Sequence, residues 1–272
     1  MCFVYNLFLI NLKTPQSKSL KPSNPLKNYQ KKSVFLILFG LLLNIHIIHS
    51  QTNNDVNIYN WFDKTVGKDN LDLNNGTPHI NPYRTIGDSH LYLINKYEIG
   101  KINYEGQKYY EVKLKYDIYR DILVLNPYGE SENIGINLIQ NKVESFTVQD
   151  KNFVKIDKKI ETVPELTSGY YEESKIAPGF TFYIKHHKDL QKTVLENGVF
   201  YTFKESNSFF IDLKNNISVI KGKNDIIKLF PEQKKQINGF YLMNRELQKS
   251  DLNQFMKNLM KYISNSLSIQ TK

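Results

Sequence analysis

The sequence predicts an α+β fold: mostly antiparallel β, as a curved sheet, a sandwich or an open barrel, with a helical C-terminus. Three observations predict it. The run from Tyr109 to Tyr119 alternates between apolar and charged side chains. Many further short apolar runs follow, with Asn, Gly and Pro between them. From residue 223 onward the apolar spacing changes from two residues to three and four, which is the spacing of an amphipathic helix.

Residues 1–30 come before any sign of a folded domain. They contain several serines and lysines together with three prolines, Pro15, Pro22 and Pro25. This composition is typical of a disordered extension, because it offers little apolar surface to bury. A start codon placed too far upstream would give the same pattern, so both interpretations stay open.

Residues 31–50 contain the regions of a secretory signal peptide in their usual order. The basic pair Lys31 and Lys32 precedes an apolar run, and the small residue Ser50 precedes the polar Gln51. These are the basic, apolar and cleavage regions in sequence. We therefore expect cleavage between Ser50 and Gln51, and export of the remaining chain.

A transmembrane anchor is the alternative for this segment, and an anchor needs about 20 clean apolar residues. The run here is shorter, and Asn44, His46 and His49 interrupt its second half. These residues favour cleavage. An uncleaved leader is the only membrane attachment that this interpretation allows.

Loss of the leader changes the charge and the cysteine content. Residues 1–50 contain six lysines and no acidic residue, so 30 of the 36 basic residues remain against 27 acidic ones. This near balance argues against a nucleic-acid partner, in spite of the formal charge of +9. Cys2 is the only cysteine and also lies in the leader. The exported domain therefore has no disulfide, thiolate metal site or cysteine nucleophile, which suits an oxidising compartment.

The segment 57–84 combines aromatic residues around Trp61 with a stretch rich in Asp and Asn. This composition predicts an irregular, turn-rich segment that Trp61 pins to the main body. The stretch resembles a calcium-binding loop at first sight. It lacks the glycine at the sixth position, where Asn75 stands, and the glutamate at the twelfth, where Asn81 stands, so we expect a turn.

Residues 101–119 predict a β-hairpin. Glu105 and Gly106 form a tight turn between two alternating runs. Alternation places one apolar row and one charged row on opposite faces, which indicates an antiparallel sheet with one wet face. The expected apolar row consists of Tyr110, Val112, Leu114, Tyr116 and Ile118.

The rest of the β-rich domain, which we place at residues 51–222, consists of short strands. They are expected over 91–94, 122–125, 136–139, 145–148, 153–156, 170–173, 180–185, 200–203, 209–213 and 217–220.

Residues 223–272 predict helices that pack on the same domain. Asn224 caps a first helix that ends at Phe230, Pro231 starts a second that ends at Leu242, and Ser250 caps a third. The third has an apolar stripe that should lie on the sheet, made of Leu252, Phe255, Met256, Leu259, Ile263 and Leu267.

The histidines beyond the leader are His79, His90, His186 and His187. Adjacent residues on a strand point to opposite faces, so His186 and His187 cannot bind one ion without a bulge. We expect no metal site and no cofactor. The sequence has no Gly-x-Ser-x-Gly elbow, phosphate-binding loop, dinucleotide fingerprint or His-Glu-x-x-His motif.

Acidic and aromatic residues remain as candidates for a site. Asp117 and Asp121 are an acid pair beside Tyr116 and Tyr119, an arrangement that a glycosidase would use. Any β-protein with 27 acidic residues offers such pairs, however. Trp61, Tyr116 and Tyr119 are candidates to stack on a sugar, with packing in the sheet as the alternative.

Four segments carry a resemblance to a known family. They are Tyr59-Asn-Trp-Phe-Asp-Lys-Thr-Val-Gly67, Tyr104-Glu-Gly-Gln-Lys-Tyr-Tyr110, Leu114-Lys-Tyr-Asp-Ile-Tyr-Arg-Asp121 and Leu229-Phe-Pro-Glu-Gln-Lys-Lys-Gln-Ile237. On these segments, residues 57–265 resemble an uncharacterised family of exported proteins from Bacteroidota-type bacteria. The resemblance implies export to the periplasm or outer-membrane surface and a role in the envelope. It brings no assigned activity, so no functional residue is carried over.

Our leading hypothesis is an exported, non-catalytic envelope protein that binds another envelope protein or a glycan. The first alternative is a hydrolase acting on envelope carbohydrate, with Asp117 and Asp121 as its acids. The second is a structural subunit of a surface assembly, which should expose a large apolar patch.

Overall fold

The computed structural model describes residues 50–67, 70–87, 95–127, 130–157 and 163–270. The expected extension at residues 1–30 lies outside these ranges. So do the expected leader apart from Ser50, the strand expected over 91–94, and His90. The chain divides into two compact units, of which Asp55–Lys272 contains the sheet and the C-terminal helices.

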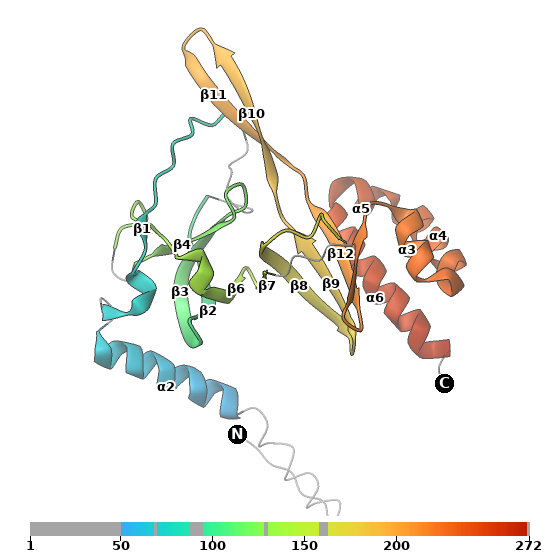
Figure 1. The fold of residues 1–272 in the computed structure, drawn as a ribbon, viewed down its shortest axis with the longest axis horizontal. Coiled ribbons are helices and arrows are strands. Elements are labelled where there is room, and N and C mark those ends of the chain that lie inside the picture. The colour runs from blue at the N-terminus through green and yellow to red at the C-terminus, as the bar shows by residue number, and fades with distance from the viewer. Residues whose placement is uncertain (1–49, 68–69, 88–94, 128–129, 158–162, 271–272) are drawn as a thin grey trace, which may run out of the picture. The chain divides into compact units, whose positions relative to one another are not determined.

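The fold is α+β, as the sequence predicts (Figure 1). Eleven strands form one sheet in the order β1-β5-β4-β3-β2-β6-β7-β8-β9-β12-β13, and neighbouring strands are antiparallel. The sheet ends at β1 and β13 and does not close into a barrel. Its strands are β1 (Thr77–Pro78), β2 (Glu98–Tyr104), β3 (Gln107–Asp117), β4 (Ile122–Asn126), β5 (Ile136–Asn137), β6 (Val143–Val148), β7 (Lys151–Ile156), β8 (Gly169–Ala177), β9 (Phe180–Lys185), β12 (Ser208–Leu213) and β13 (Asn216–Ile220).

The hairpin predicted over residues 101–119 is confirmed as β2 and β3. Its two turn residues, Glu105 and Gly106, have φ of 51° and 77°. Two successive left-handed residues are the signature of a type I′ turn, whose twist matches that of the paired strands.

The strict alternation predicted for β3 is wrong at one point. Tyr110 and Glu111 both lie opposite Lys101 of β2, which is a β-bulge, and Glu111 has the left-handed φ of 56°. The extra residue reverses the alternation before it. Tyr109 is therefore buried in place of Tyr110, whereas Leu114 stays buried as expected.

A second, two-stranded sheet consists of β10 (Lys188–Leu195) and β11 (Gly198–Glu205). The sequence predicts part of β11 but not β10, whose residues are mostly polar and exposed. A segment around Thr85 extends this pair, because the backbone N–H of Tyr201 donates to the carbonyl of Arg84 at 3.0 Å.

The segment 57–84 differs from the expectation at its start. Ser50–Val66 forms the helix α2, which ends at Gly67 with a φ of 87°. The expectation that Trp61 pins this segment is wrong, because its side chain is 65% exposed. Tyr59 makes the contact instead, with its ring 5.8 Å from that of Tyr110.

The C-terminal helices are confirmed, with one addition, but two of the predicted caps are wrong. Asn224 lies inside the first of these helices, where Gly222 takes the cap position. Asp251, and not Ser250, caps the long last helix, since its Oδ1 accepts the N–H of Gln254 at 2.8 Å. No helix within the described ranges has an apolar stretch long enough to cross a membrane. The helical elements after η3 (Asp72–Asn74) and η4 (Gln140–Lys142) are α3 (Lys223–Leu229), η5 (Pro231–Gln233), α4 (Lys234–Met243), the unexpected α5 (Arg245–Ser250) and α6 (Leu252–Gln270).

The apolar stripe of α6 packs on the sheet as predicted, except at Leu252, which is 45% exposed. Phe255 and Leu259 are fully buried in one cluster with Phe182 and Ile211 of β9 and β12. A separate cluster on β2, β3, β6 and β7 contains Tyr116 and other aromatic residues. A third, smaller cluster contains Tyr171 of β8 and Phe210 of β12 together with Val163 and Leu166.

Candidate functional site

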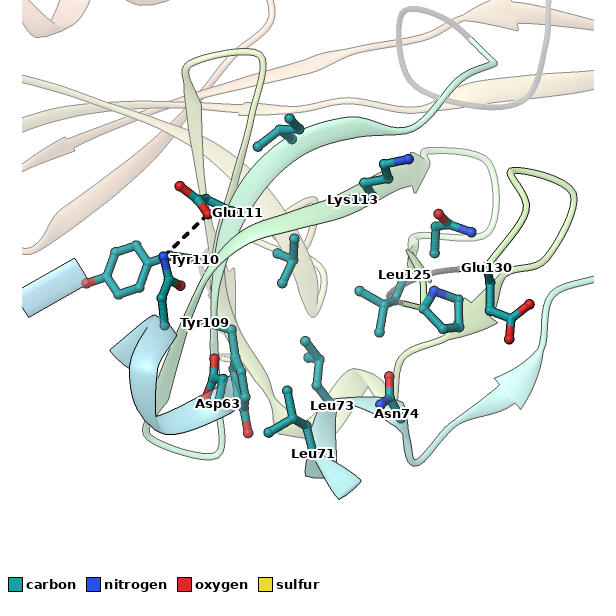
Figure 2. Close-up of a pocket in the computed structure, with 15 residues that line it drawn as sticks. Asp63, Leu71, Leu73, Asn74, Tyr109, Tyr110, Glu111, Lys113, Leu125 and Glu130 are labelled. Atoms are coloured by element: carbon teal, nitrogen blue, oxygen red, sulfur yellow. Dashed lines mark hydrogen bonds between the residues drawn. The ribbon is translucent and has the colours of Figure 1, made fainter. Parts of the chain in front are cut away.

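A cavity of about 510 Å³ lies between α2, the turn at η3 and strands β2 to β4 (Figure 2). We call it the α2 cavity. Its apolar wall contains Leu71, Leu73, Val112, Leu125 and Pro127, and its polar part contains Asn60, Asp63, Glu111, Lys113 and Glu130. Tyr109 and Tyr110 join the two parts.

The β-bulge in β3 shapes one side of this cavity. It places Tyr110 and Glu111 next to each other on the rim, where regular alternation would direct them to opposite faces. The dashed line in Figure 2 marks the long hydrogen bond, 3.4 Å, from Asn60 Nδ2 to Glu111 Oε2. The left-handed backbone of Glu111 costs about 1 kcal/mol or more, and such strain concentrates at functional sites.

Tyr109 and Asp63 form the buried base of the cavity. The Tyr109 side chain is 2% exposed and that of Asp63 is 5% exposed. Burial, reinforced by the negative charges of Asp63 and Asp72, raises the pKa of Tyr109 to about 12. The phenol therefore stays protonated at physiological pH and can donate a hydrogen bond.

The polar part of the α2 cavity carries more negative than positive charge. Asp63, Glu111 and Glu130 supply carboxylates, and Lys113 supplies the one amine among the described lining residues. Lys113 Nζ also lies 3.9 Å from Glu132 Oε1, which is a long and exposed ion pair. The cavity therefore disfavours anionic ligands and offers acceptors to hydroxyl or amine donors.

In the part of the chain that the structure describes, no group of three His, Cys, Asp or Glu residues is arranged to hold a metal ion. His186 and His187 form the link between β9 and β10, outside the strand on which they were expected, and lie in different surroundings. His186 is buried, and the His187 side chain is 40% exposed.

The candidate acid Asp117 stabilises a turn. Its Oδ1 accepts the backbone N–H groups of Tyr119 at 3.1 Å and Arg120 at 2.9 Å. Its Oδ2 accepts Arg120 Nε at 2.6 Å. The carboxylate is fully buried and does not line the α2 cavity.

The candidate acid Asp121 joins three parts of the sheet. Its Oδ1 accepts the hydroxyl of Tyr116 at 2.5 Å, and its Oδ2 accepts Lys185 Nζ at 2.7 Å and the N–H of Tyr170 at 3.3 Å. Burial, together with the charge of Asp121, raises the pKa of Tyr116 well above its ordinary value. A β-carbon on Gly169 would lie 2.0 Å from Asp121 Oδ2, so this network needs glycine there.

The three candidate sugar-stacking residues lie apart. Tyr116 is 1% exposed and out of reach of a ligand. Tyr119 packs in an aromatic cluster, with ring distances of 5.7 Å to Tyr83 and 5.3 Å to Phe203. Trp61 is exposed, but it lies on the face of α2 away from the cavity lining.

The expected cleavage site, Ser50 and Gln51, falls at the first two residues of α2. Cleavage there removes one residue from the helix and leaves the cavity lining intact, because the first lining residue is Asn60.

A second polar cluster, which sequence reasoning missed, lies under α6. Glu172 of β8 is buried, binds His186 Nε2 at 2.7 Å and is also hydrogen-bonded to Lys257 of α6. Burial raises the pKa of Glu172, but the bonds from His186 and Lys257 outweigh it and leave that pKa below its ordinary value. Burial lowers the pKa of His186, so its imidazole is neutral at pH 7.

Sequence reasoning also missed the principal residues of the α2 cavity. Asp63 gives no signal of its own, because its role depends on a helix that was not predicted. Gly100 gives the one signal for the bulge, since glycine inside a strand often marks one. A β-carbon on Gly100 would lie 2.1 Å from the carbonyl oxygen of Thr147.

A scan against protein-family models, a search of curated proteins and a search of solved structures each found no match for this chain.

Proposed function

We propose that the protein is an exported, non-catalytic binding protein of the cell envelope, and that a glycan occupies the α2 cavity. The leader-like segment at residues 31–50 supports export. The composition of the α2 cavity carries the choice of ligand: an apolar wall meets two tyrosines and three carboxylates in a space of about 510 Å³.

A sugar ring fits this arrangement because it has two kinds of surface. Its C–H face packs on apolar and aromatic side chains, here Val112 and Tyr110, which are partly exposed. Its hydroxyl edge donates to carboxylates, here Glu111 and Glu130, which are exposed, and such charge-assisted hydrogen bonds are the stronger ones. Few well-placed polar groups in a mostly apolar pocket are the usual pattern of a ligand site.

The hydrolase alternative with Asp117 and Asp121 as its acids is disfavoured by the positions of these two residues. The carboxylates of Asp117 and Asp121 each accept hydrogen bonds from within the fold, and neither lines the α2 cavity. A glycosidase needs two carboxyl groups on either side of the scissile bond.

The outer face of α2 favours a second candidate function, the binding of an envelope protein. Trp61 is 65% exposed there and Ile58 is 61% exposed, with Phe62 and Val66 also exposed. Tryptophan is enriched at the centres of protein interfaces. The same side chains would serve a structural subunit of a surface assembly.

Glycan binding is tested by calorimetry with soluble fragments of envelope polysaccharide and peptidoglycan. We expect Glu111→Gln to weaken binding about tenfold, because a charged hydrogen-bond acceptor contributes roughly 1.5–3 kcal/mol. Glu246→Gln is the matched control, since Glu246 is 93% exposed on α5, outside the cavity.

Two results would decide against the proposal. One is a fragment that binds Glu111→Gln as well as the original chain. The other is loss of binding in Trp61→Ala, which would move the ligand to the outer face of α2.

A further inference from the structure

The basic residues of this chain are unevenly distributed. From Lys221 to Lys272 there are ten lysines and arginines but four aspartates and glutamates, whereas residues 51–220 contain 20 basic and 23 acidic residues. The helical end is therefore positive, and the β-rich part is slightly negative. Such asymmetry indicates an anionic partner for the helical end.

One exposed region concentrates this charge. A hollow of about 540 Å³ lies where α4 meets α5 and the start of α3. Its lining has three basic side chains and no acidic one. We call this region the α4–α5 corner and define it by Lys223, Tyr241, Leu242, Met243, Arg245 and Lys249.

The charges of the corner are available to a partner. Within the described ranges, Lys223 and Arg245 form no ion pair with a carboxylate, and Lys223 Nζ lies 5.6 Å from the ring centre of Tyr241. Lys249 lies 3.9 Å from Glu246, and both are highly exposed. An exposed pair at that distance contributes little.

Two large apolar side chains stand beside these charges. Leu242 is 61% exposed and Met243 is 72% exposed. The core contacts of α4 are made by Ile237 and Phe240, which are buried. The fold therefore does not use Leu242 and Met243.

We propose that the α4–α5 corner docks on an anionic membrane surface, which departs from the expectation that an uncleaved leader is the only membrane attachment. The three basic side chains would contact lipid phosphates, while Leu242 and Met243 enter the boundary of the acyl chains. Charge alone would suit a free phosphate or an acidic polysaccharide. The exposed side chains of Leu242 and Met243 favour a lipid surface, because neither a free phosphate nor a polysaccharide offers an apolar phase.

The experiment measures binding of the full chain to two kinds of vesicle, one of phosphatidylcholine alone and one that also contains phosphatidylglycerol. The apolar run before Ser50 would bind both kinds, and the six lysines of residues 1–50 would favour the anionic kind in every variant. The readout is therefore the change in the ratio of the two affinities between the original chain and each variant. We expect a preference for the anionic vesicles that disappears at high salt.

The test variant is Lys223→Glu/Arg245→Glu/Lys249→Glu. Loss of one basic residue lowers affinity for such a surface by about fivefold, so we expect the preference to fall about a hundredfold or to vanish. Leu242→Ser/Met243→Ser should weaken binding to the anionic vesicles with no change of charge.

The matched control is Lys108→Glu/Lys192→Glu/Lys204→Glu, three exposed lysines on β3, β10 and β11. An equal loss in this control would overturn the proposal, because total charge would then explain the binding. So would an unchanged preference in the test variant. Binding of inorganic phosphate by the corner, with no preference for anionic vesicles, would assign the site to a free anion and also overturn the proposal.

Neutral substitutions, Lys223→Gln/Arg245→Gln/Lys249→Gln, repeat the test if the charge reversals unfold the chain.

Discussion

At the scale of single residues, the acids that the sequence singles out serve the fold. Asp121 holds Tyr116 and Lys185 together, and Asp117 closes a turn with Arg120. A sequence shows that such acids stand near aromatic residues. It does not show which donors their oxygens accept, because Tyr170 and Lys185, which donate to Asp121, are distant along the chain, and the donors to Asp117 depend on the local turn.

The buried cluster under α6 makes stability depend on pH. His186 is buried among Glu172, Lys151 and Lys257, and burial holds its pKa below the ordinary value of 6.5. As pH falls through 6.5, the unfolded chain binds a proton at this residue before the folded chain does, so stability falls. Below the ordinary Glu172 value of 4.5 the loss continues, since the pKa of Glu172 is also lowered.

Urea unfolding between pH 8 and pH 5 measures this effect. We expect His186→Gln to reduce the loss of stability between pH 7 and pH 5, and His187→Gln to retain it, because His187 is partly exposed. Parallel pH profiles for the original chain and His186→Gln would show that the cluster is not the cause.

At the scale of elements, the sequence predicts those whose apolar spacing is regular. The hairpin, the strands after residue 121 and α6 are all present. It misses β10, whose exposed and polar residues show no alternation, and α2, whose largest apolar side chains face outward. The bulge in β3 is missed because Glu111 takes up a left-handed conformation inside a strand pattern.

Substitution of Gly100 tests the packing that accompanies this bulge. A β-carbon there would collide with the carbonyl of Thr147, so we expect Gly100→Ala to lower the free energy of unfolding by about 2 kcal/mol. Gly239→Ala, inside α4, is the control and should not lower it, since nothing lies within 4 Å of its β-carbon position and alanine favours a helix. Equal effects of the two substitutions in urea unfolding would show that β2 has room at Gly100.

At the scale of the whole molecule, the fold class and the uneven distribution of charge along the chain follow from the sequence, but the α2 cavity does not. The cavity joins residues from 60 to 130 that belong to a helix, a turn and three strands. Its existence depends on how α2 lies on the hairpin, through contacts such as that of Tyr59 with Tyr110. The sequence contains those residues without any regular spacing that would relate them.

Export is the claim on which the function depends, because an envelope glycan is not available to a cytoplasmic protein. The most direct test is the N-terminal sequence and intact mass of the protein recovered from fractionated cells. We predict a chain that begins at Gln51 in the periplasmic or outer-membrane fraction. A full-length chain in the cytoplasm would contradict the account, and a full-length chain in the inner membrane would replace cleavage with an anchor at residues 34–50.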